Sequence, residues 1–287
     1  MLGPNDLVLC GPPLAHVPLL DRLVPAEKAG FTGLSVMPGD LWALEEQGVS
    51  LRDLSARLAD HGLQLAEVDC IGCWLPSQVH SPAHARFREL LMTLTPERVI
   101  DLAARAGARS VVAVEMMGVT PSPDEAAEAF ARICDLAAEH GLPVHIEFLP
   151  FGGIPDLAAA SAIVESAARP NGGLTIDSWH MFRSGSTLEQ LAAIPGERIF
   201  TVQINDAPAL AGADLFQETM TGRLLPGDGD FDLTGLIRTL DRIGSKAPIG
   251  VEVFSPAQAG ATVDQIIMAW ASSARATIDK ARNSDER

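Results

Sequence analysis

The chain has 287 residues and carries 37 Asp and Glu against 21 Lys and Arg, a formal net charge of −16. A surface with this excess of negative charge repels phosphate backbones, so we expect no nucleic-acid partner. Apolar residues make up 47% of the chain and charged residues 20%, which is typical of a globular protein and excludes a disordered or fibrous one.

The first eleven residues lack the basic start and apolar run of a secretory signal, and no stretch reaches the ~18 apolar residues of a membrane span. We therefore expect a cytoplasmic protein without a membrane partner. Four cysteines are too few for a disulfide framework. Cys70 and Cys73 have CxxC spacing, but no second pair follows at zinc-finger spacing, so we expect ordinary reduced thiols near a strand end.

Short apolar runs alternate eight times with longer segments rich in Ala, Leu, Glu and Arg at helical spacing. The predicted strands, in chain order, are Leu7–Cys10, Gly33–Val36, Gln64–Asp69, Ser110–Val114, Val144–Glu147, Leu174–Asp177, Phe200–Gln203 and Ile249–Val253. The predicted helices are Val17–Ala29, Leu51–His61, Pro96–Ala106, Pro123–His140, Pro155–Ala168, Thr187–Ile194, Leu233–Ile243 and Val263–Ala281.

Eight parallel strands joined by crossover helices close most economically into a (βα)8 barrel, the TIM barrel of the α/β class. No Gly-x-Gly-x-x-Gly follows the first strand, so the main signature of a dinucleotide-binding sheet is missing. No segment indicates a linker, and we predict one barrel domain over residues 1–282 and a flexible tail at 283–287. The stretches Ile71–Thr93 and Asn205–Asp230 are predicted to be unstructured loops at the barrel mouth.

Each of the last four predicted strands ends in a side chain that carries oxygen. These residues are Glu147, Asp177, Gln203 and Glu252. The carboxyl ends of barrel strands converge on one mouth, where buried carboxylates are unfavourable unless a cation compensates them. One such residue alone is more often a solvated carboxylate, but four on consecutive strands favour a metal site. Their all-oxygen set suits a hard divalent ion such as Mn²⁺ or Mg²⁺.

The motifs around these residues resemble a known family. They are Glu147 in IEFLP, Asp177 with His180 in IDSWH, Gln203 with Asp206 in QINDAP, Arg223 ahead of PGDGDFDL, and Glu252 in GVEVF. Together they resemble the xylose isomerase-like superfamily of sugar phosphate isomerases and epimerases, which also contains ketose 3-epimerases, inosose dehydratases and 3-dehydroshikimate dehydratases. The resemblance covers Val144 to Phe254; the first half matches only in its strand and helix rhythm.

The resemblance implies a barrel that holds one divalent ion, with Mn²⁺ first and Mg²⁺, Co²⁺ or Zn²⁺ as alternatives. It also implies that Glu147 and Glu252 are both ligands and proton carriers. A chelating ion stabilises the enediolate that forms when a carboxylate removes a proton beside a carbonyl. Return of the proton on the opposite face gives epimerisation, return to the neighbouring carbon gives isomerisation, and loss of a β-hydroxyl gives dehydration.

We therefore predict a metal-dependent isomerase or epimerase of a hydroxy-carbonyl small molecule, a keto-sugar or a cyclic polyol-like compound. The alternative is a lyase on the same scaffold, either a dehydratase or an enzyme that β-eliminates an oxidised C-glycoside. Abasic-site endonucleases share the superfamily fold, but they require a basic surface, which the charge of −16 opposes. A non-catalytic barrel that serves a partner subunit is a third class, and homo-oligomerisation stays open.

Other residues near the predicted mouth have two interpretations each. His145 points to the same interior side as Glu147, because strand side chains alternate, and it is either a catalytic base or a hydrogen-bonded core histidine. His180, Arg223, Arg183 and Trp179 are predicted to bind substrate, although Arg183 fits a surface ion pair nearly as well. Gln203 replaces the His of many relatives, which shifts the preference away from zinc.

Polar residues at the ends of the early strands, namely His16, Asp69 and Glu115, are expected to be structural. Large apolar residues also gather in the predicted mouth loops: Trp42, Trp74, Met116, Met117, Phe148, Trp179, Phe182 and Phe254. Most such residues pack in cores. If half of them line the pocket, the sequence favours a cyclic or aryl-bearing hydroxyketone over a small free sugar.

Overall fold

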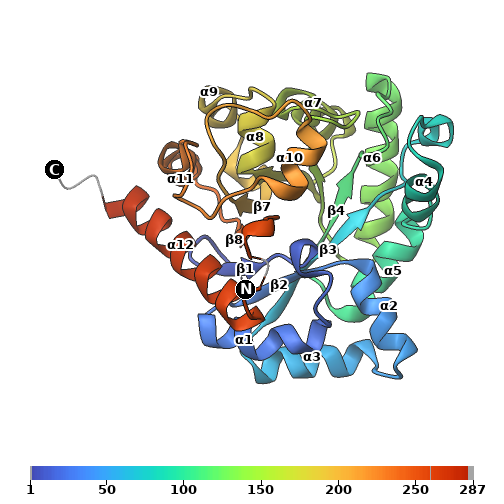
Figure 1. The fold of residues 1–287 in the computed structure, drawn as a ribbon. Helices are drawn as coiled ribbons and strands as arrows, with labels where there is room; N and C mark the ends of the chain where they lie inside the picture. The colour runs from blue at the N-terminus through green and yellow to red at the C-terminus, as the bar shows by residue number, and fades with distance from the viewer. Residues whose placement is uncertain (1, 259, 284–287) are drawn as a thin grey trace.

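Eight parallel strands hydrogen-bond in chain order, and the last pairs with the first, so that they close a barrel in the computed structural model (Figure 1). The structure describes residues 2–258 and 260–283. The strands are β1 (Leu7–Leu9), β2 (Gly33–Val36), β3 (Gln64–Ile71), β4 (Ser110–Val114), β5 (Val144–Glu147), β6 (Gly172–Asp177), β7 (Ile199–Ile204) and β8 (Ile249–Val251). The predicted (βα)8 barrel is confirmed, and each predicted strand overlaps an observed one.

The helices form a ring around the strands, and α1 packs beside α12 to close it (Figure 1). They are α1 (Leu23–Ala29), α2 (Pro38–Glu46), α3 (Leu51–Asp60), α4 (Ala85–Leu91), α5 (Pro96–Ala106), α6 (Pro123–Ala138), α7 (Leu157–Ala167), α8 (Ser178–Arg183), α9 (Leu188–Ala192), α10 (Leu215–Thr221), α11 (Leu233–Arg242) and α12 (Val263–Asn283). Short 3-10 turns lie at Pro12–Leu14, Leu19–Arg22, Pro76–His80, Gly196–Arg198 and Pro256–Gln258.

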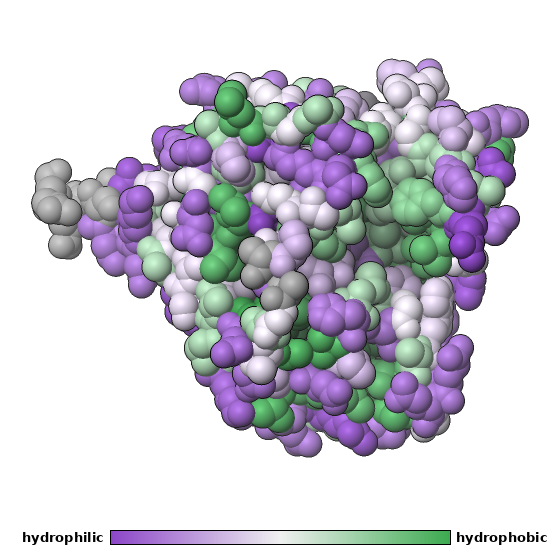
Figure 2. Space-filling view, in the orientation of Figure 1, coloured by the Kyte–Doolittle hydropathy of each residue, from purple (hydrophilic) through white to green (hydrophobic). Residues whose placement is uncertain are grey.

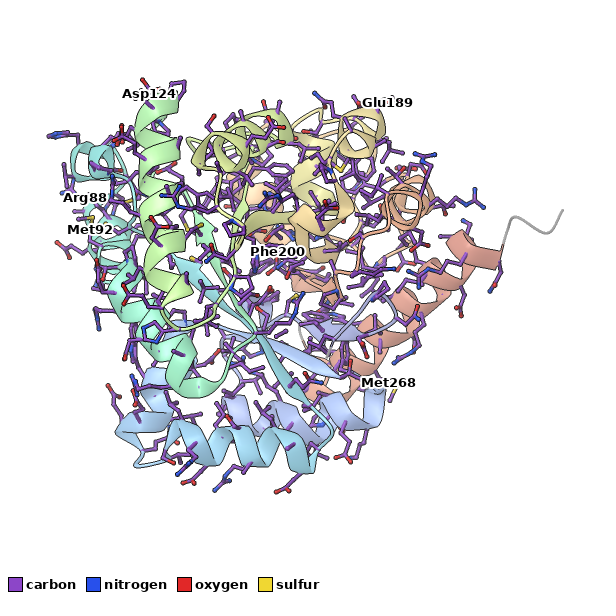
Figure 3. All side chains as sticks on the ribbon, turned by 180° about the vertical axis from the view of Figure 1, so that it is seen from behind. Arg88, Met92, Asp124, Glu189, Phe200 and Met268 are labelled. Atoms are coloured by element: carbon purple, nitrogen blue, oxygen red, sulfur yellow. The ribbon has the colours of Figure 1, made fainter. Side chains whose placement is uncertain are left out.

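Sequence pattern and capping explain most of these helices. In α5 the residues that face inward are Val99, Ile100, Leu102, Ala103 and Ala106, and the helix ends at Gly107, whose φ of 70° suits glycine. In α6 the hydroxyl of Ser122 accepts from the backbone of Glu125, with Pro123 in the first turn. The side chains of the inward faces fill the space between helices and strands, whereas exposed ones such as Met268 point outward (Figure 3).

Several expectations about the connections are wrong. The stretches 71–93 and 205–230 are not unstructured, since they contain α4 and α10, and α2 and α8 are also additional. These helices have only six to nine residues, too few to show a helical apolar period. The expected tail overlaps α12 at Asn283, and residues 284–287 lie outside the described part of the chain.

Two further sequence expectations concern cysteines and membranes. Cys70 and Cys73 are free, with Cys70 buried in β3, as the absence of a second pair predicts. Among the described helices, none combines the length and the apolar character of a membrane span.

Glu115, directly after β4, joins three connections at the barrel mouth. Its carboxylate accepts from the backbone amides of Met117 (2.9 Å), Gly118 (3.2 Å) and Gly153 (2.5 Å), and it lies 3.5 Å from the amide nitrogen of Gln78. The side chain is 1% exposed, so it acts as a structural anchor, as expected from the sequence. The close approach requires glycine at 153, where an added Cβ would lie 1.8 Å from the carbonyl oxygen of Val119.

We expect Gly153→Ala to lower the free energy of unfolding by about 1–3 kcal/mol, because the methyl group cannot fit without moving backbone. Gly39→Ala is the matched control, since nothing lies within 4 Å of its added Cβ and the residue is in α2, where Ala is favourable. Urea unfolding measures both variants. Equal stabilities of the two variants would contradict the assigned role of the Glu115 anchor.

Candidate active site

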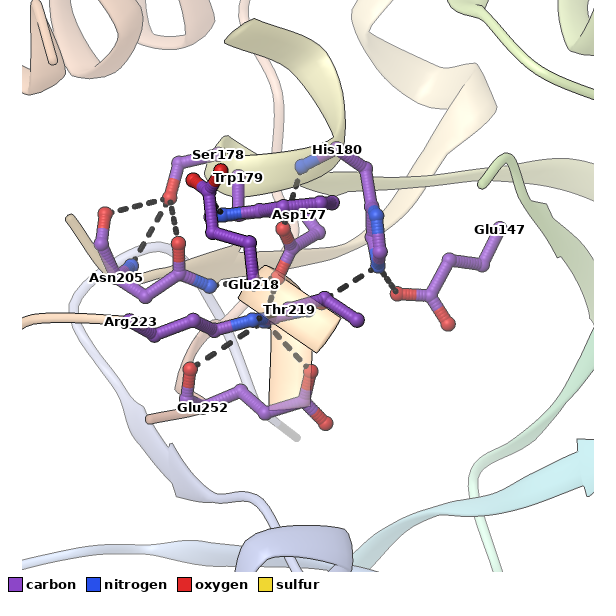
Figure 4. A network of polar contacts seen from close by, with 10 residues as sticks. All are labelled: Glu147, Asp177, Ser178, Trp179, His180, Asn205, Glu218, Thr219, Arg223 and Glu252. Carbon is purple, nitrogen blue, oxygen red and sulfur yellow. Dashed lines mark hydrogen bonds and ion pairs between the residues drawn. The ribbon is translucent and has the colours of Figure 1, made fainter. Parts of the chain in front are cut away.

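Three buried side chains at the mouth converge on one point. Glu147 ends β5, Asp177 ends β6, and His180 lies in the first turn of α8. Each offers an atom within 4.8 Å of the other two (Figure 4). The local fold causes this, because α8 starts directly after β6 and Asp177 caps it by accepting from the backbone of His180 at 2.9 Å. The imidazole is thereby turned back over the strand ends.

Arg223 brings Glu252 into the same group (Figure 4). Its Nη1 lies 3.0 Å from Oδ2 of Asp177 and 3.0 Å from Oε2 of Glu252, and its Nη2 lies 3.3 Å from Nε2 of His180. The guanidinium also donates to the hydroxyl of Thr219 on α10, at 2.7 and 3.2 Å. Arg223 is 1% exposed, so it is part of the site rather than a surface group.

Negative charge exceeds positive charge around this point. Four carboxylates act on one another here, those of Asp69, Glu147, Asp177 and Glu252, against the one guanidinium of Arg223. Burial and neighbouring carboxylates raise the pKa of Glu252 to about 8, although Arg223 opposes the shift, and burial with Glu67 raises the pKa of Asp69 to about 7. The pKa of Glu147 is also raised, first by burial and then by Asp69 and Glu252. A divalent cation would relieve this repulsion.

Unpaired buried atoms test whether the residues fit such an ion. His180 Nδ1 is buried and has no hydrogen-bond partner. A buried polar group left unpaired costs about 1–3 kcal/mol, so this imidazole is expected to have a ligand that the protein itself does not supply. Gln203 is fully buried and pairs in register with Asp177, and its side chain interacts with the carboxyl group of Glu67. The donor set of carboxylates, amide oxygen and imidazole therefore fits one divalent ion.

The structure thus groups Glu147, Asp177 and Glu252, and it adds His180, which the sequence assigned to substrate, to the groups that can hold a metal. Gln203 does not line the cavity, and its part as a ligand stays a prediction. Asn205 is a residue that the sequence did not indicate; its amide donates to Oδ2 of Asp177 at 2.8 Å and fixes that carboxylate. Asp206 caps the loop by accepting from the backbones of Gly227 and Phe231.

His145 lies deeper in the barrel and does not line the cavity. Its ring nitrogens lie 2.6 Å from the hydroxyl of Thr175 and 3.0 Å from that of Ser110, and Nε2 lies 3.6 Å from Glu67. Burial lowers the pKa of His145 to about 3, so the ring is neutral. These contacts agree with a hydrogen-bonded core histidine, and they place no substrate within its reach.

Arg183 and Trp179 also do not line the cavity. Both donate to Oε1 of Glu218 on α10, Arg183 at 2.6 Å and Trp179 at 3.2 Å, the contact that Figure 4 shows. The side chain of Arg183 is 5% exposed, so its ion pair is buried rather than at the surface. These contacts fasten α10 to α8, and α10 in turn carries Thr219, the partner of Arg223.

A cavity of about 180 Å³ opens above the cluster. Glu147, His180, Arg223 and Glu252 form part of its lining, and most of its remaining wall is apolar. Asp69 also lines it, against the expectation that this residue is structural. The available signal was its position at the end of a predicted strand, the same signal that identified Glu147.

The chain is similar to known proteins. Residues 23–276 match the family model described as xylose isomerase-like TIM barrel. The chain belongs to this family. The family was expected from motifs in the second half alone, and the match extends into the first half as well.

Among curated relatives, a 3-dehydroshikimate dehydratase of Pseudomonas aeruginosa is 31% identical over 83% of this chain, which spans only 36% of that relative. An inosose isomerase of Bacillus velezensis is 27% identical over 68% of this chain and 70% of its own length. Among solved structures, the IolI protein with a bound zinc atom has a TM-score of 0.82 at 21% identity and covers 96% of this chain and 98% of its own. The two curated relatives are thus a dehydratase and an isomerase.

The raised pKa values predict how stability depends on pH when no metal is bound. Between pH about 7 and 8.5, folded Asp69 and Glu252 keep protons that the unfolded chain, with ordinary values of 3.8 and 4.5, has already lost. The folded state then binds more protons than the unfolded state, so the free energy of unfolding falls as pH rises. The unfolded histidines, with an ordinary value of 6.5, are largely neutral by then.

Urea unfolding in EDTA at the two ends of this range measures the slope, and saturating Mn²⁺ is expected to weaken or reverse it because the ion stabilises the ionised carboxylates. Glu252→Gln should reduce the slope, whereas Glu165→Gln, an exposed change on α7, should leave it unchanged. A metal-free protein whose stability rises with pH in this window would refute the charge assignment.

Proposed function

We propose that this protein is a divalent-metal-dependent isomerase or epimerase that transfers a proton beside the carbonyl of a hydroxy-carbonyl substrate. The observation that carries the proposal is that Glu147 and Glu252, which come from β5 and from the residue after β8, line the same small cavity. Burial raises the pKa of both carboxyl groups, and that of Glu252 reaches about 8, which suits a group that exchanges protons with a substrate near neutral pH.

Each residue of the cluster has a part in this reaction. One of the two glutamates removes the proton next to the carbonyl, and the other delivers a proton to the opposite face or to the neighbouring carbon. Arg223 and His180, which both line the cavity, orient substrate oxygens by hydrogen bonds. A bound divalent ion would supply Lewis-acid stabilisation of the negative charge that develops on those oxygens.

Glu147, Asp177 and Glu252, with Gln203 or His180, are the residues that we propose would hold this ion. We propose Mn²⁺ because the set is rich in oxygen. An imidazole ligand would widen the choice to Co²⁺ or Zn²⁺, and zinc is the ion bound in the IolI structure.

A lyase is the second candidate, because a 3-dehydroshikimate dehydratase is the curated relative that is 31% identical over most of this chain. A dehydratase would use the same first proton transfer. The second carboxyl group would then donate its proton to the departing β-hydroxyl, so that water leaves and a carbon–carbon double bond forms.

Deuterium uptake tests the proposal. The Mn²⁺-loaded protein is incubated in D2O with keto-sugars and inososes, and we expect deuterium at the carbon beside the carbonyl, with EDTA abolishing it. Glu147→Gln and Glu252→Gln should each slow the uptake by about 10²–10⁴-fold, because each variant loses a proton carrier. Glu165→Gln is the control for an exposed glutamate.

The product mass separates the two candidates, since loss of one water indicates the lyase, whereas a product of unchanged mass indicates the isomerase or epimerase. Full activity of both active-site variants would contradict the proposal.

A further inference from the structure

Most of the polar groups of the cavity wall come from one half of the barrel. The half formed by β5 to β8 and the loops that follow them provides Glu147, His180, Thr219, Arg223 and Glu252, and it also provides the apolar Leu149, Phe151, Phe216, Met220 and Phe254. The other half, formed by β1 to β4 and their loops, provides Pro12, Met37, Asp69, Cys70, Val114 and Met116. Among these described residues Asp69 is the one charged group. A substrate held at the carboxylate cluster therefore meets an apolar surface and a single carboxyl group on its far side.

The rim of the cavity is aromatic and unusually exposed. Phe151, after β5, meets Phe216 of α10 edge to face, with ring centroids 5.4 Å apart, and also contacts the His180 ring at 6.1 Å. Phe216 and Met220 line the cavity, yet they are 47% and 43% exposed. Figure 2 shows hydrophobic residues gathered beside a hollow in the face that α10 borders. An apolar strip thus runs from His180 at the cluster to the rim, and a hydrophobic group of a ligand would cover it.

Apart from the proposed metal ion, the described lining offers no free basic side chain to an anionic group of a substrate. Arg223 is the one Arg or Lys among the described residues of the wall, and its guanidinium already bridges Asp177 and Glu252. Asp69 faces the same space, and its ionised form disfavours a second negative charge through repulsion. Phosphate and carboxylate groups are normally recognised by free Arg or Lys, which this wall lacks.

We propose that the substrate is an uncharged, amphipathic hydroxy-carbonyl compound whose apolar ring lies along Phe151 and Phe216. Its polar end faces Glu147, Arg223 and Glu252, and Asp69 accepts a hydrogen bond from a further hydroxyl group. This assignment rests on the proposed function and narrows it, since it selects against sugar phosphates and against carboxylated rings. Phe216 and Asp69 are then the specificity-determining residues of the site.

Binding of three probes to the full Mn²⁺-loaded chain tests the assignment by calorimetry. Dihydroxyacetone carries the polar end alone, 2-hydroxyacetophenone adds an apolar ring, and its 4-carboxy derivative adds a remote negative charge. We expect 2-hydroxyacetophenone to bind at least about tenfold more tightly than either of the others, which corresponds to about 1.4 kcal/mol. Equal or tighter binding of dihydroxyacetone or of the carboxylated probe overturns the assignment.

Two variants locate the selectivity. Phe216→Ala should remove the higher affinity for the aryl probe and leave the affinity for dihydroxyacetone unchanged. Asp69→Asn should reduce the difference in affinity between the aryl probe and its carboxylated form. Met268→Ala, a change of an exposed residue on α12, is the control. It should alter neither the affinity ratio of the aryl probe to dihydroxyacetone nor that of the aryl probe to its carboxylated form. Unchanged ratios in both Phe216→Ala and Asp69→Asn overturn the assignment of these residues.

Deuterium uptake into the same ketones separates this inference from the proposed function. If the aryl probe binds tightly but no ketone exchanges its protons, the proposed chemistry fails and the substrate class stands. If dihydroxyacetone exchanges readily while the aryl probe neither binds nor exchanges, the chemistry stands and the substrate class fails.

Discussion

Repulsion among buried carboxylates is the constraint on which this site depends. The ends of parallel barrel strands bring Glu147, Asp177 and Glu252 to one mouth, and Asp69 faces them from β3. Such a group is unfavourable in isolation, because the negative charges are taken out of water and placed near one another. Arg223 offsets part of the cost and leaves an excess of negative charge. The excess of acidic groups that destabilises the fold also favours a bound cation. The proposed metal-dependent chemistry and the loss of stability therefore have the same cause.

Short helices at the mouth position the side chains that surround the buried carboxylates. Because α8 begins at the residue after Asp177, the cap of the helix and the orientation of His180 are fixed by one carboxylate. Because Glu218 joins α10 to Arg183 and Trp179, Thr219 is held where it can receive the guanidinium of Arg223. The mouth of the barrel is therefore assembled from strand ends, while the helices above it position the imidazole of His180 and the guanidinium of Arg223.

The sequence predicts the strands and the strand-end residues because both follow from the regular alternation of apolar runs and helical segments. Apolar runs separated by helical segments predict the eight strands, and the carboxyl ends of these strands meet at the mouth, although Gln203 does not line its cavity. The interior partners of His145 do not follow in this way, since Thr175 and Ser110 belong to other strands and meet it only through the stagger of the barrel. The same holds for Arg183 and Trp179, whose common partner Glu218 lies in a helix too short to show a period.

The position of a bound metal tests the account most directly. Crystals of the full chain grown with Mn²⁺ would be measured at the manganese absorption edge, and the anomalous signal would locate the ion without reference to any assumed ligand. We predict one ion at the mouth with Glu147, Asp177 and Glu252 as ligands, at oxygen distances of about 2.0–2.3 Å. A signal absent from the mouth, with Arg223 still bridging Asp177 and Glu252, would contradict the account.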